Sequence, residues 1–249
     1  MNRLPGMMTA LAMAAILMAG CSKNAAPPAA PEKAPETRAP DSAAPAEESL
    51  PGTADADGWQ KAFDGKTLAG WKSTPFGGEG KVEVKDGQII LNTGPGDLTG
   101  ITWTGGTIPK DHYEIALETC RLDGSDFFCG LTFPVRDSCI SLICGGWGGS
   151  LVGLSSLDGY DASENETTKM MEFANNRWYR IQVRVSGDKI NAWIDDEELV
   201  AAELSGRKVG VRWEVEASQP LGVAAWRTKA GIRNIRIRNI EPVPDDTQK

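Results

Sequence analysis

Residues Trp178 to Ile194 read WYRIQVRVSGDKINAWI, and this stretch decides the fold. From Trp178 to Val185 every second residue is apolar, which is typical of a strand with one buried face. Ser186-Gly187-Asp188 follows, and glycine and aspartate tolerate the backbone angles that a hairpin turn requires. Lys189 to Ile194 then alternates in the same way. The stretch predicts an antiparallel β-hairpin.

The same pattern recurs on both sides of this hairpin, with Asp, Asn and Gly turns between the segments. No amphipathic helix of more than two turns is indicated, and Glu172–Asn176 is the best candidate for a short one. So many short strands in one domain-sized stretch predict an all-β fold, a two-sheet antiparallel sandwich. The further predicted strands are 81–84, 88–91, 100–103, 113–122, 127–133, 138–143, 151–154, 209–215 and 231–237.

The N-terminus has the features of an export signal. Arg3 supplies a positive charge, Met7–Met18 is an apolar run too short to span a bilayer comfortably, and small residues precede Cys21. Residues 17–21 resemble the lipobox of bacterial lipoproteins, which implies that Cys21 carries the lipid, palmitate included. Ser22 indicates sorting to the outer membrane, with the domain periplasmic or surface-exposed. An ordinary secretory signal with an incidental cysteine remains the alternative.

Composition divides the rest of the chain. Residues 22–57 are rich in Ala, Pro and Glu and hold only Leu50 as a sizeable apolar side chain, so we expect a disordered tether. Residues 58–243 are long enough for one domain with its own core, and 244–249 are expected to be a disordered tail. The formal net charge of -8 argues against nucleic acid as a partner.

Four blocks of the domain resemble one known family. They are Ala62–Lys72, with its Phe-Asp-Gly-Lys opening and Gly-Trp close, then Val82–Ile89, Asn176–Glu197 and Gly231–Arg238. Together they are similar to the 3-keto-disaccharide hydrolase domain, a concanavalin-like, laminin-G-like jelly roll. The resemblance implies a jelly-roll fold and a carbohydrate partner. The aromatic residues of the first block are expected to pack inward and fasten the N-terminal segment to the sandwich.

The middle and end of the chain depart from the family pattern. The carboxylates that many members carry on one central strand are missing from Asp137–Gly149, and Ala225–Thr228 stands where many have an Asp-His-Gly segment. The only histidine, His112, lies in a predicted surface turn. The usual general base or metal ligand is therefore absent, and a hydrolase would have to work with carboxylates.

The densest polar cluster is the loop Leu157–Thr167. Carboxylates there could hydrogen-bond sugar hydroxyls or cleave a glycosidic bond, while an aromatic ring stacks on a pyranose. A structural calcium site and a plain solvated loop are the alternatives. The predicted catalytic acids are Asp158, Asp161, Glu164 and Glu166, and the predicted substrate-binding residues are Trp147, Tyr160, Arg136, Trp226 and Arg227. No metal site and no cofactor are predicted beyond that calcium alternative.

Four cysteines remain if Cys21 is lipidated: Cys120, Cys129, Cys139 and Cys144. An even number in an oxidising compartment favours one or two disulfides, and the spacing does not choose the pairing. A zinc site is disfavoured because no Cys-x2-Cys pair occurs.

The sequence thus predicts a carbohydrate-active envelope lipoprotein, anchored to the membrane through its lipid alone. Hydrolysis of a glycoside, as in a 3-keto-disaccharide, is the leading hypothesis. A non-catalytic glycan-binding module and a laminin-G-like protein-binding domain are the alternatives.

Overall fold

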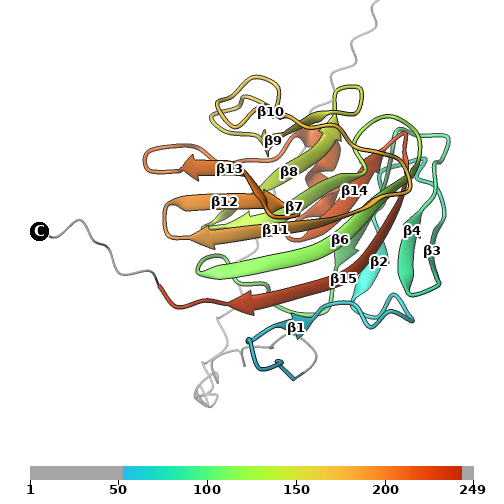
Figure 1. Cartoon of the computed structure of the whole chain (residues 1–249), viewed down its shortest axis with the longest axis horizontal. Coiled ribbons are helices and arrows are strands. Elements are labelled where there is room, and N and C mark those ends of the chain that lie inside the picture. Colours follow the sequence, from blue (N-terminus) through green and yellow to red (C-terminus); the bar gives the residue numbers. More distant parts are fainter. Residues whose placement is uncertain (1–52, 243–249) are drawn as a thin grey trace, which may run out of the picture. The chain divides into compact units, whose positions relative to one another are not determined.

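The computed structural model describes residues 53–242, which form two antiparallel sheets packed face to face (Figure 1). Within these residues one sheet has eight strands and the other has seven. This confirms the predicted all-β sandwich of jelly-roll type. The predicted signal, Cys21 and most of the tether lie outside the described residues, as do 243–249.

The first sheet, here called sheet A, contains the predicted hairpin Trp178–Ile194. In spatial order its strands are β13 (Glu197–Glu203), β12 (Lys189–Ile194), β11 (Trp178–Ser186), β6 (Tyr113–Asp123), β15 (Lys229–Asn239), β4 (Gln88–Leu91) and β3 (Val82–Lys85), with β1 (Gln60–Lys61) pairing with β15.

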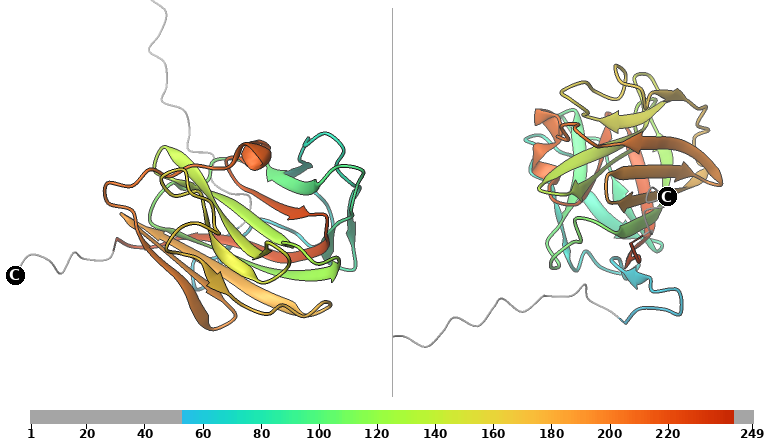
Figure 2. Two further views of the ribbon diagram at one scale, coloured as in Figure 1. Left: turned by 90° about the horizontal axis from the view of Figure 1, so that it is seen from above. Right: turned by 90° about the vertical axis from the view of Figure 1, so that its left-hand side faces the viewer.

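The second sheet, sheet B, is continuous from β10 to β2. Its strands are β10 (Lys169–Met170), β9 (Leu151–Ser155), β8 (Ser138–Gly146), β7 (Cys129–Val135), β14 (Gly222–Trp226), β5 (Leu98–Trp103) and β2 (Trp71–Ser73). A 3-10 helix, η1 (Trp213–Ser218), lies on the outer side of sheet B, away from sheet A (Figure 2, left).

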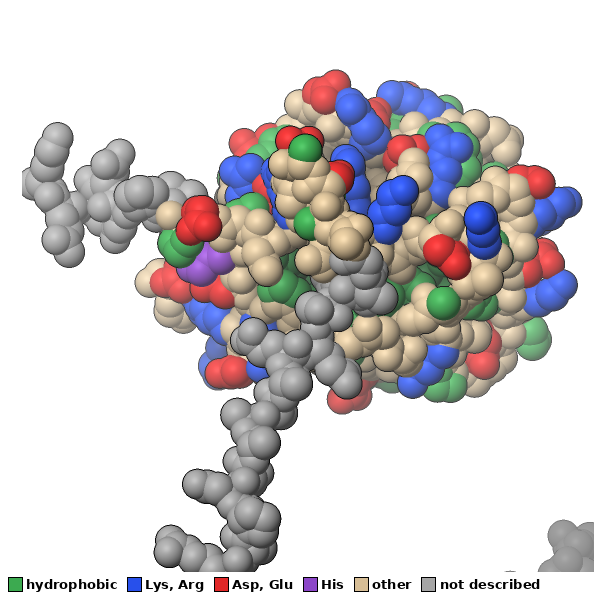
Figure 3. Space-filling view, turned by 90° about the horizontal axis from the view of Figure 1, so that it is seen from below, with side chains coloured by type: hydrophobic (Ala, Val, Ile, Leu, Met, Phe, Trp, Pro, Cys, Tyr) green, Lys and Arg blue, Asp and Glu red, His purple; other side chains and the backbone are tan. Residues whose placement is uncertain are grey.

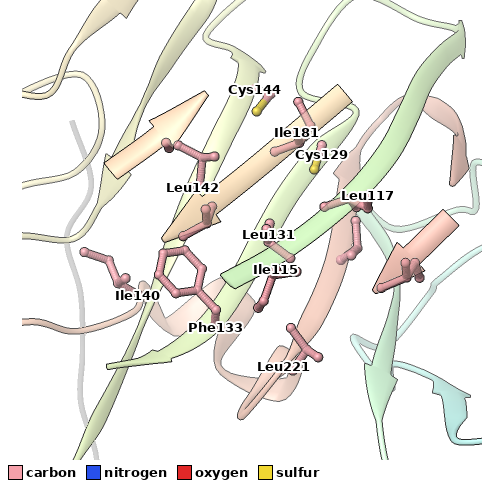
Figure 4. Packing of buried hydrophobic residues seen from close by; sticks show 14 of the residues in the cluster. Ile115, Leu117, Cys129, Leu131, Phe133, Ile140, Leu142, Cys144, Ile181 and Leu221 are labelled. Atoms are coloured by element: carbon pink, nitrogen blue, oxygen red, sulfur yellow. The ribbon is translucent and has the colours of Figure 1, made fainter. Parts of the chain in front are cut away.

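The core lies between the sheets because strand residues alternate between two faces. On β8, Ile140, Leu142 and Cys144 join the main apolar cluster, and on β11 so do Ile181 and Val183. Figure 4 shows Ile140, Leu142, Cys144 and Ile181 meeting in the space between the sheets. The residues between them in sequence therefore face outward, and those on sheet B build the site described below.

The outer face of sheet A is charged. Glu114 on β6 is fully buried and accepts hydrogen bonds from Arg184 Nε at 2.6 Å and Arg238 Nε at 2.7 Å. Glu118 on the same strand pairs with Arg233. Across the face of the molecule in Figure 3, acidic and basic side chains are interspersed, without a field of one sign.

The first sequence block packs as expected. Phe63 and Trp71 are buried in the main core, and Leu68 packs against it. The Asp64 carboxylate accepts hydrogen bonds from the backbone N–H groups of the two residues that follow Gly65, which fixes the turn. Trp71 Nε1 donates to the Ala62 carbonyl at 2.7 Å, so the block is closed on itself.

Two predicted elements are wrong. The predicted strand 209–215 forms only one isolated bridge, at Val209, before the chain turns into η1. Val209 packs against the main core, whereas Val211 and Val215 pack on the outer face of sheet B, where Val215 meets Leu98 and Ala224. The predicted helix at Glu172–Asn176 is an irregular segment, because the Phe173 carbonyl accepts from Arg121 and the Ala174 N–H donates to Tyr179.

The cysteines are free thiols throughout residues 53–242, so neither predicted disulfide is present in the structure. Cys129 on β7 and Cys144 on β8 are paired in the sheet register, and their side chains lie close together in the core (Figure 4). Contact with Cys129, together with burial, raises the pKa of the Cys144 thiol well above its ordinary value. No helix in the described part of the chain is long and apolar enough to span a bilayer.

Candidate functional site

A cavity of about 230 Å³ opens on the outer face of sheet B. Its floor is formed by residues of β8 and β9 that alternate with core residues, namely Ser141, Ile143 and Ser155. Ser141 and Ser155 are register partners on the two strands. The floor is therefore polar at two adjacent positions of sheet B.

The two serines differ in their hydrogen bonding. Ser141 Oγ shares a hydrogen bond of 2.8 Å with Thr132 Oγ1 on the neighbouring strand. Ser155 is only 2 % exposed, and its Oγ has no hydrogen-bond partner anywhere in residues 53–242. A buried hydroxyl without a partner costs free energy, so this oxygen is available to a bound group.

Aromatic side chains form one wall. Phe127 precedes β7 and Trp226 ends β14, and their rings lie 6.3 Å apart between centroids at a tilt of 39°. Trp147 stands at the turn between β8 and β9 and is 48 % exposed. Together the three rings, here called the aromatic wall, give the cavity broad apolar faces that can stack on a flat ligand.

Local structure holds Trp147 at this wall. The β8–β9 turn places Trp147 in the left-handed region at φ 48°, which bulky residues rarely adopt. The Asp126 carboxylate accepts the Phe127 N–H at 2.7 Å and the Gly148 N–H at 3.4 Å, so it joins the turn to the start of the neighbouring strand. Strain of this kind at an exposed aromatic is typical of a functional position.

An arginine flanked by carboxylates also lines the cavity. Arg212 donates to Glu214 through Nε at 3.1 Å and Nη2 at 2.6 Å, and through Nη1 to Asp161 at 2.7 Å. The hydrogen bonds from Arg212 lower the pKa of Glu214, although burial opposes them. Glu214 is thus held ionised at the cavity, and Arg212 is fixed in place from both sides.

The predicted catalytic acids divide between two arginines. Asp161 belongs to the Arg212 network beside the cavity. Asp158 and Glu166 both bind Arg207, outside the cavity lining. Backbone donation from Lys208, followed by Arg207, lowers the pKa of Asp158, and Arg207 lowers that of Glu166.

The loop that carries these acids is held by an amide. Asn165 Nδ2 donates to the carbonyls of Leu154 at 2.8 Å and Asp161 at 2.6 Å, which ties the loop to β9. Glu164 is exposed and Tyr160 is 57 % exposed. Within residues 53–242 no group of three or more His, Cys, Asp or Glu side chains is placed to hold a metal ion.

The predicted arginines lie apart from the cavity lining. Arg136 donates to Asp188 and to the Leu204 carbonyl, between the β7–β8 turn and the sheet A loops. Arg227 binds Asp97 and lies over the Trp226 ring, with its guanidinium 5.9 Å from the ring centroid. His112 sits beside Asp111, in the turn where the sequence placed it.

Sequence reasoning found Trp147 and Trp226 but missed the rest of the lining. Arg212 and Glu214 were assigned to a strand, and their i, i+2 spacing around Trp213 was the signal that they share a direction. Phe127 lies in the predicted strand 127–133, and Ser155 directly follows the predicted strand 151–154, so neither residue stood out. Nothing in the sequence distinguishes the free hydroxyl of Ser155 from that of Ser141.

Comparison with known proteins gives one family. The model of the family described as 3-keto-alpha-glucoside-1,2-lyase-like domain matches residues 58–238. Among curated proteins no match is found.

Solved structures with similar folds have low sequence identity. Crh5 transglycosylase in its apo form has a TM-score of 0.53 and 13% identity, over 80% of this chain and 90% of that one. A protein of unknown function with a galectin-like fold from Bacillus subtilis has a TM-score of 0.51 and 11% identity, over 70% of this chain and 90% of that one. At these identities the likeness supports the sandwich fold alone.

Proposed function

The chain belongs to the family of 3-keto-alpha-glucoside-1,2-lyase-like domains, and from this premise we propose that the cavity on sheet B binds a saccharide. Membership confirms the resemblance of the four sequence blocks and supports a carbohydrate-related function. The observation that carries the proposal is the combination of an aromatic wall with a buried, unpartnered hydroxyl in the floor.

The chemistry of a sugar ring fits this arrangement. A pyranose presents C–H groups on its faces and hydroxyls around its edge, so it stacks on an aromatic ring while its hydroxyls need donors and acceptors. Trp147 supplies the aromatic ring on which a face of the sugar can stack. Contacts to the hydroxyls around the edge of the sugar come from Ser155 Oγ in the floor. The Arg212 guanidinium and the Glu214 carboxylate, which also line the cavity, supply further contacts.

The binding proposal is tested with Trp147→Ala and a matched control. Met170→Ala also removes an exposed apolar side chain, 69 % exposed, that lies outside the cavity lining. A panel of gluco-disaccharides and their 3-keto derivatives is titrated calorimetrically into each protein. We expect Trp147→Ala to weaken binding about tenfold and Met170→Ala to leave it unchanged. Equal affinities for all three proteins would refute the site.

Cleavage of the bound glycoside is the second candidate function, favoured by the family match and by two carboxylates, Asp126 and Glu214, that line one cavity. In a 3-keto-glycoside the ketone acidifies the C2 proton, so a base can remove it while the C1–O bond breaks and the aglycone leaves. Hydrolysis by water likewise needs a base. Glu214 is held ionised by Arg212 and can accept a proton, while the same hydrogen bonds lower its pKa and make it a weaker base. Of the acids predicted from sequence, Asp161 is nearest to it through Arg212.

Turnover separates the two candidates. With 3-keto-trehalose as the probe, product release that is abolished in Glu214→Gln and retained in Met170→Ala supports cleavage. Saccharide binding without product release supports a lectin-like module. If the protein neither binds nor cleaves any probe, a protein-binding role of the sandwich takes precedence.

We further propose that the sandwich is displayed from the bacterial outer membrane by a lipid on Cys21 and the segment 22–57. The sequence features of the first 57 residues support this proposal. Metabolic labelling with palmitate tests it: label should enter the wild-type chain and be lost in Cys21→Ser.

A further inference from the structure

The turn that carries Trp147 is weakly fixed from within. Trp147, Gly148 and Gly149 follow one another with positive φ angles of 48°, 91° and 113°. Glycine loses more backbone freedom on folding than any other residue, and a left-handed tryptophan persists only where the surrounding structure holds it. Inside the turn, the Gly149 N–H donates to the Gly146 carbonyl at 3.2 Å. The position of the Trp147 ring therefore depends on contacts from outside the turn.

One such contact comes from between the two sheets. Arg121 on β6 continues the alternation of Ile115 and Leu117, which lie in the main core, so its side chain points into the sandwich. The residue is only 6 % exposed, and its guanidinium lies 5.6 Å from the centroid of the Phe128 ring. A buried charge is costly unless it is hydrogen-bonded. The acceptors of its N–H groups therefore show which segments this arginine holds.

The Arg121 guanidinium joins three segments that are far apart in the sequence. Nη1 donates to the Gly149 carbonyl in the β8–β9 turn at 3.3 Å and to the Asp126 carbonyl in the β6–β7 loop at 3.5 Å. Nε donates to Asn175 Oδ1 at 2.7 Å and Nη2 to the Phe173 carbonyl, both between β10 and β11. All four acceptors are carbonyl or amide oxygens, so through these bonds the arginine ties the loops at one end of the sandwich together.

Both Nη1 contacts lead to Trp147. Gly149 ends the turn two residues after Trp147, and the Asp126 carboxylate accepts the Gly148 N–H at 3.4 Å. The packing is close, because a Cβ placed on Gly149 would lie 3.0 Å from Nη1 of the arginine and 2.7 Å from a backbone oxygen of the β6–β7 loop. The turn is thus held between the buried guanidinium and the Asp126 carboxylate, which lines the cavity.

We propose that Arg121 is a positioning residue, which holds the β8–β9 turn from inside the sandwich so that the Trp147 ring stands at the cavity. The inference rests on the proposed saccharide-binding function. Arg121 belongs to sheet A and is not among the residues that line the cavity on sheet B. Any specific effect of Arg121 on affinity must therefore pass through the residues that it holds.

The first test is a double-mutant cycle between Arg121 and Trp147 in the full chain. Arg121→Lys keeps the charge but loses the planar fork that reaches several acceptors at once. Calorimetric titration with trehalose and 3-keto-trehalose should show affinity about three- to tenfold weaker in Arg121→Lys than in the wild type. In the Trp147→Ala background, the same substitution should change affinity less than about twofold, because the ring through which Arg121 acts is gone.

Asn175→Ala is the matched control for the cycle. It removes the acceptor of the Nε bond and leaves both Nη1 contacts in place. It should therefore leave the affinity for both probes unchanged. Affinity that falls as much in Asn175→Ala as in Arg121→Lys would mean that general loosening of the loops, and not the hold on the turn, weakens binding.

Amide hydrogen exchange without ligand measures the hold on the turn directly. Peptides that cover residues 146–150 should exchange at least about fivefold faster in Arg121→Lys, while β11 and β12 stay at the wild-type rate. If Arg121→Lys does not fold, Gly149→Ala takes its place, since the added methyl group separates the turn from the guanidinium. It should give the same faster exchange and the same loss of affinity.

The remaining outcomes separate this inference from the saccharide proposal. Equal losses of affinity from Arg121→Lys in the wild-type and Trp147→Ala backgrounds would refute the positioning role. Unchanged exchange of residues 146–150 would refute it as well, whether or not a saccharide binds. If the wild type binds neither probe while the turn exchanges faster in Arg121→Lys, the saccharide proposal fails for these probes and the hold of Arg121 on the Trp147 turn is supported.

Discussion

Trp147 presents its ring at the cavity from a left-handed backbone conformation, which costs an L-residue roughly 1–2 kcal/mol. Glycine has no such cost. We therefore predict that Trp147→Gly is more stable than Trp147→Ala by about 1 kcal/mol, which reverses the usual order of the two residues. Both variants should lose saccharide binding to the same extent.

Urea unfolding of the two variants measures this difference directly, because they lack the same ring and differ by one methyl group. An alanine variant as stable as the glycine variant would mean that the turn relaxes once the indole is gone. In that case the contacts of the Trp147 ring, and not the turn itself, would hold the backbone in the left-handed conformation.

Glu114 is the residue on which the charged outer face of sheet A depends. Its side chain is fully buried between Arg184 and Arg238, which are partly exposed. Removing one partner of a buried pair typically costs about 3–5 kcal/mol. We expect Glu114→Ala to lower the free energy of unfolding by about 3 kcal/mol.

Glu118→Ala on the same strand is the matched control, because the Glu118 side chain is 24% exposed and its arginine is 40% exposed. It should lose less, about 1 kcal/mol. Similar losses for the two variants, measured by denaturant unfolding, would contradict the assigned role of burial.

At the level of elements, the alternation of apolar and polar residues predicted well those strands that have one face on the core and the other face toward solvent. The hairpin β11–β12 and the long strands β6 and β15 are where the sequence placed them. Alternation failed at 209–215, because Val209 packs against the main core while Val211 and Val215 pack on the outer face of sheet B, and together they give the apolar pattern of a strand. The short pairing strands β1, β2 and β10 have too few residues to show any period.

The same limit of sequence patterns explains why only part of the cavity lining could be predicted. Two of its aromatic residues, Trp147 and Trp226, could be proposed from the sequence, and Trp147 stands in a glycine-rich segment. Arg212 and Glu214 could not, since their place depends on η1 crossing the outer face of sheet B, a contact between segments far apart in the chain.

The register of strands β7 and β8 predicts which two cysteines can form a disulfide. Cys129 and Cys144 face each other in register, whereas Cys120 lies on β6 of the other sheet and Cys139 near the opposite end of β8. Protein exported to an oxidising compartment should therefore contain a Cys129–Cys144 disulfide, formed as both thiols lose their protons and two electrons pass to a disulfide oxidant. Closing a loop of about 15 residues should add about 3 kcal/mol of stability.

Peptide mapping without reduction identifies the linked pair, and unfolding with and without dithiothreitol measures its effect. Cys120→Ser should leave the map unchanged apart from the substituted residue. A disulfide that includes Cys120 or Cys139, or four free thiols in exported protein, would contradict the prediction.

On the scale of the whole molecule, the titrating groups predict how stability depends on pH. Hydrogen bonds from Arg212 lower the pKa of Glu214 below 4.5. Burial opposes the shift at Glu118, but Asn234 and Arg233 outweigh it and lower that pKa as well. Folding therefore favours the ionised carboxylates, and their stabilisation is complete above the unfolded value and is lost as the pH falls through the lowered values.

At alkaline pH, the dependence of folding stability on pH has the opposite sign. Burial raises the pKa of Tyr113 well above 10.0, and its hydroxyl donates to the Pro134 carbonyl. The neutral phenol is favoured by folding, so its contribution is present below about pH 10 and is lost as the pH rises further. The thermal midpoint should therefore form a plateau from about pH 5 to about pH 9 and fall on both sides.

Circular dichroism melts between about pH 2.5 and pH 11 test the plateau and its origin. The double variant Glu118→Gln, Glu214→Gln should make the acid limb shallower, since Asp158 and Glu166 still contribute, while the alkaline limb keeps its slope because Tyr113 is untouched. A midpoint that rises between pH 5 and pH 3 would mean that relief of repulsion among the many acidic residues outweighs the loss of these ion pairs. The arginine-held carboxylates would then not set the acid limit of the fold.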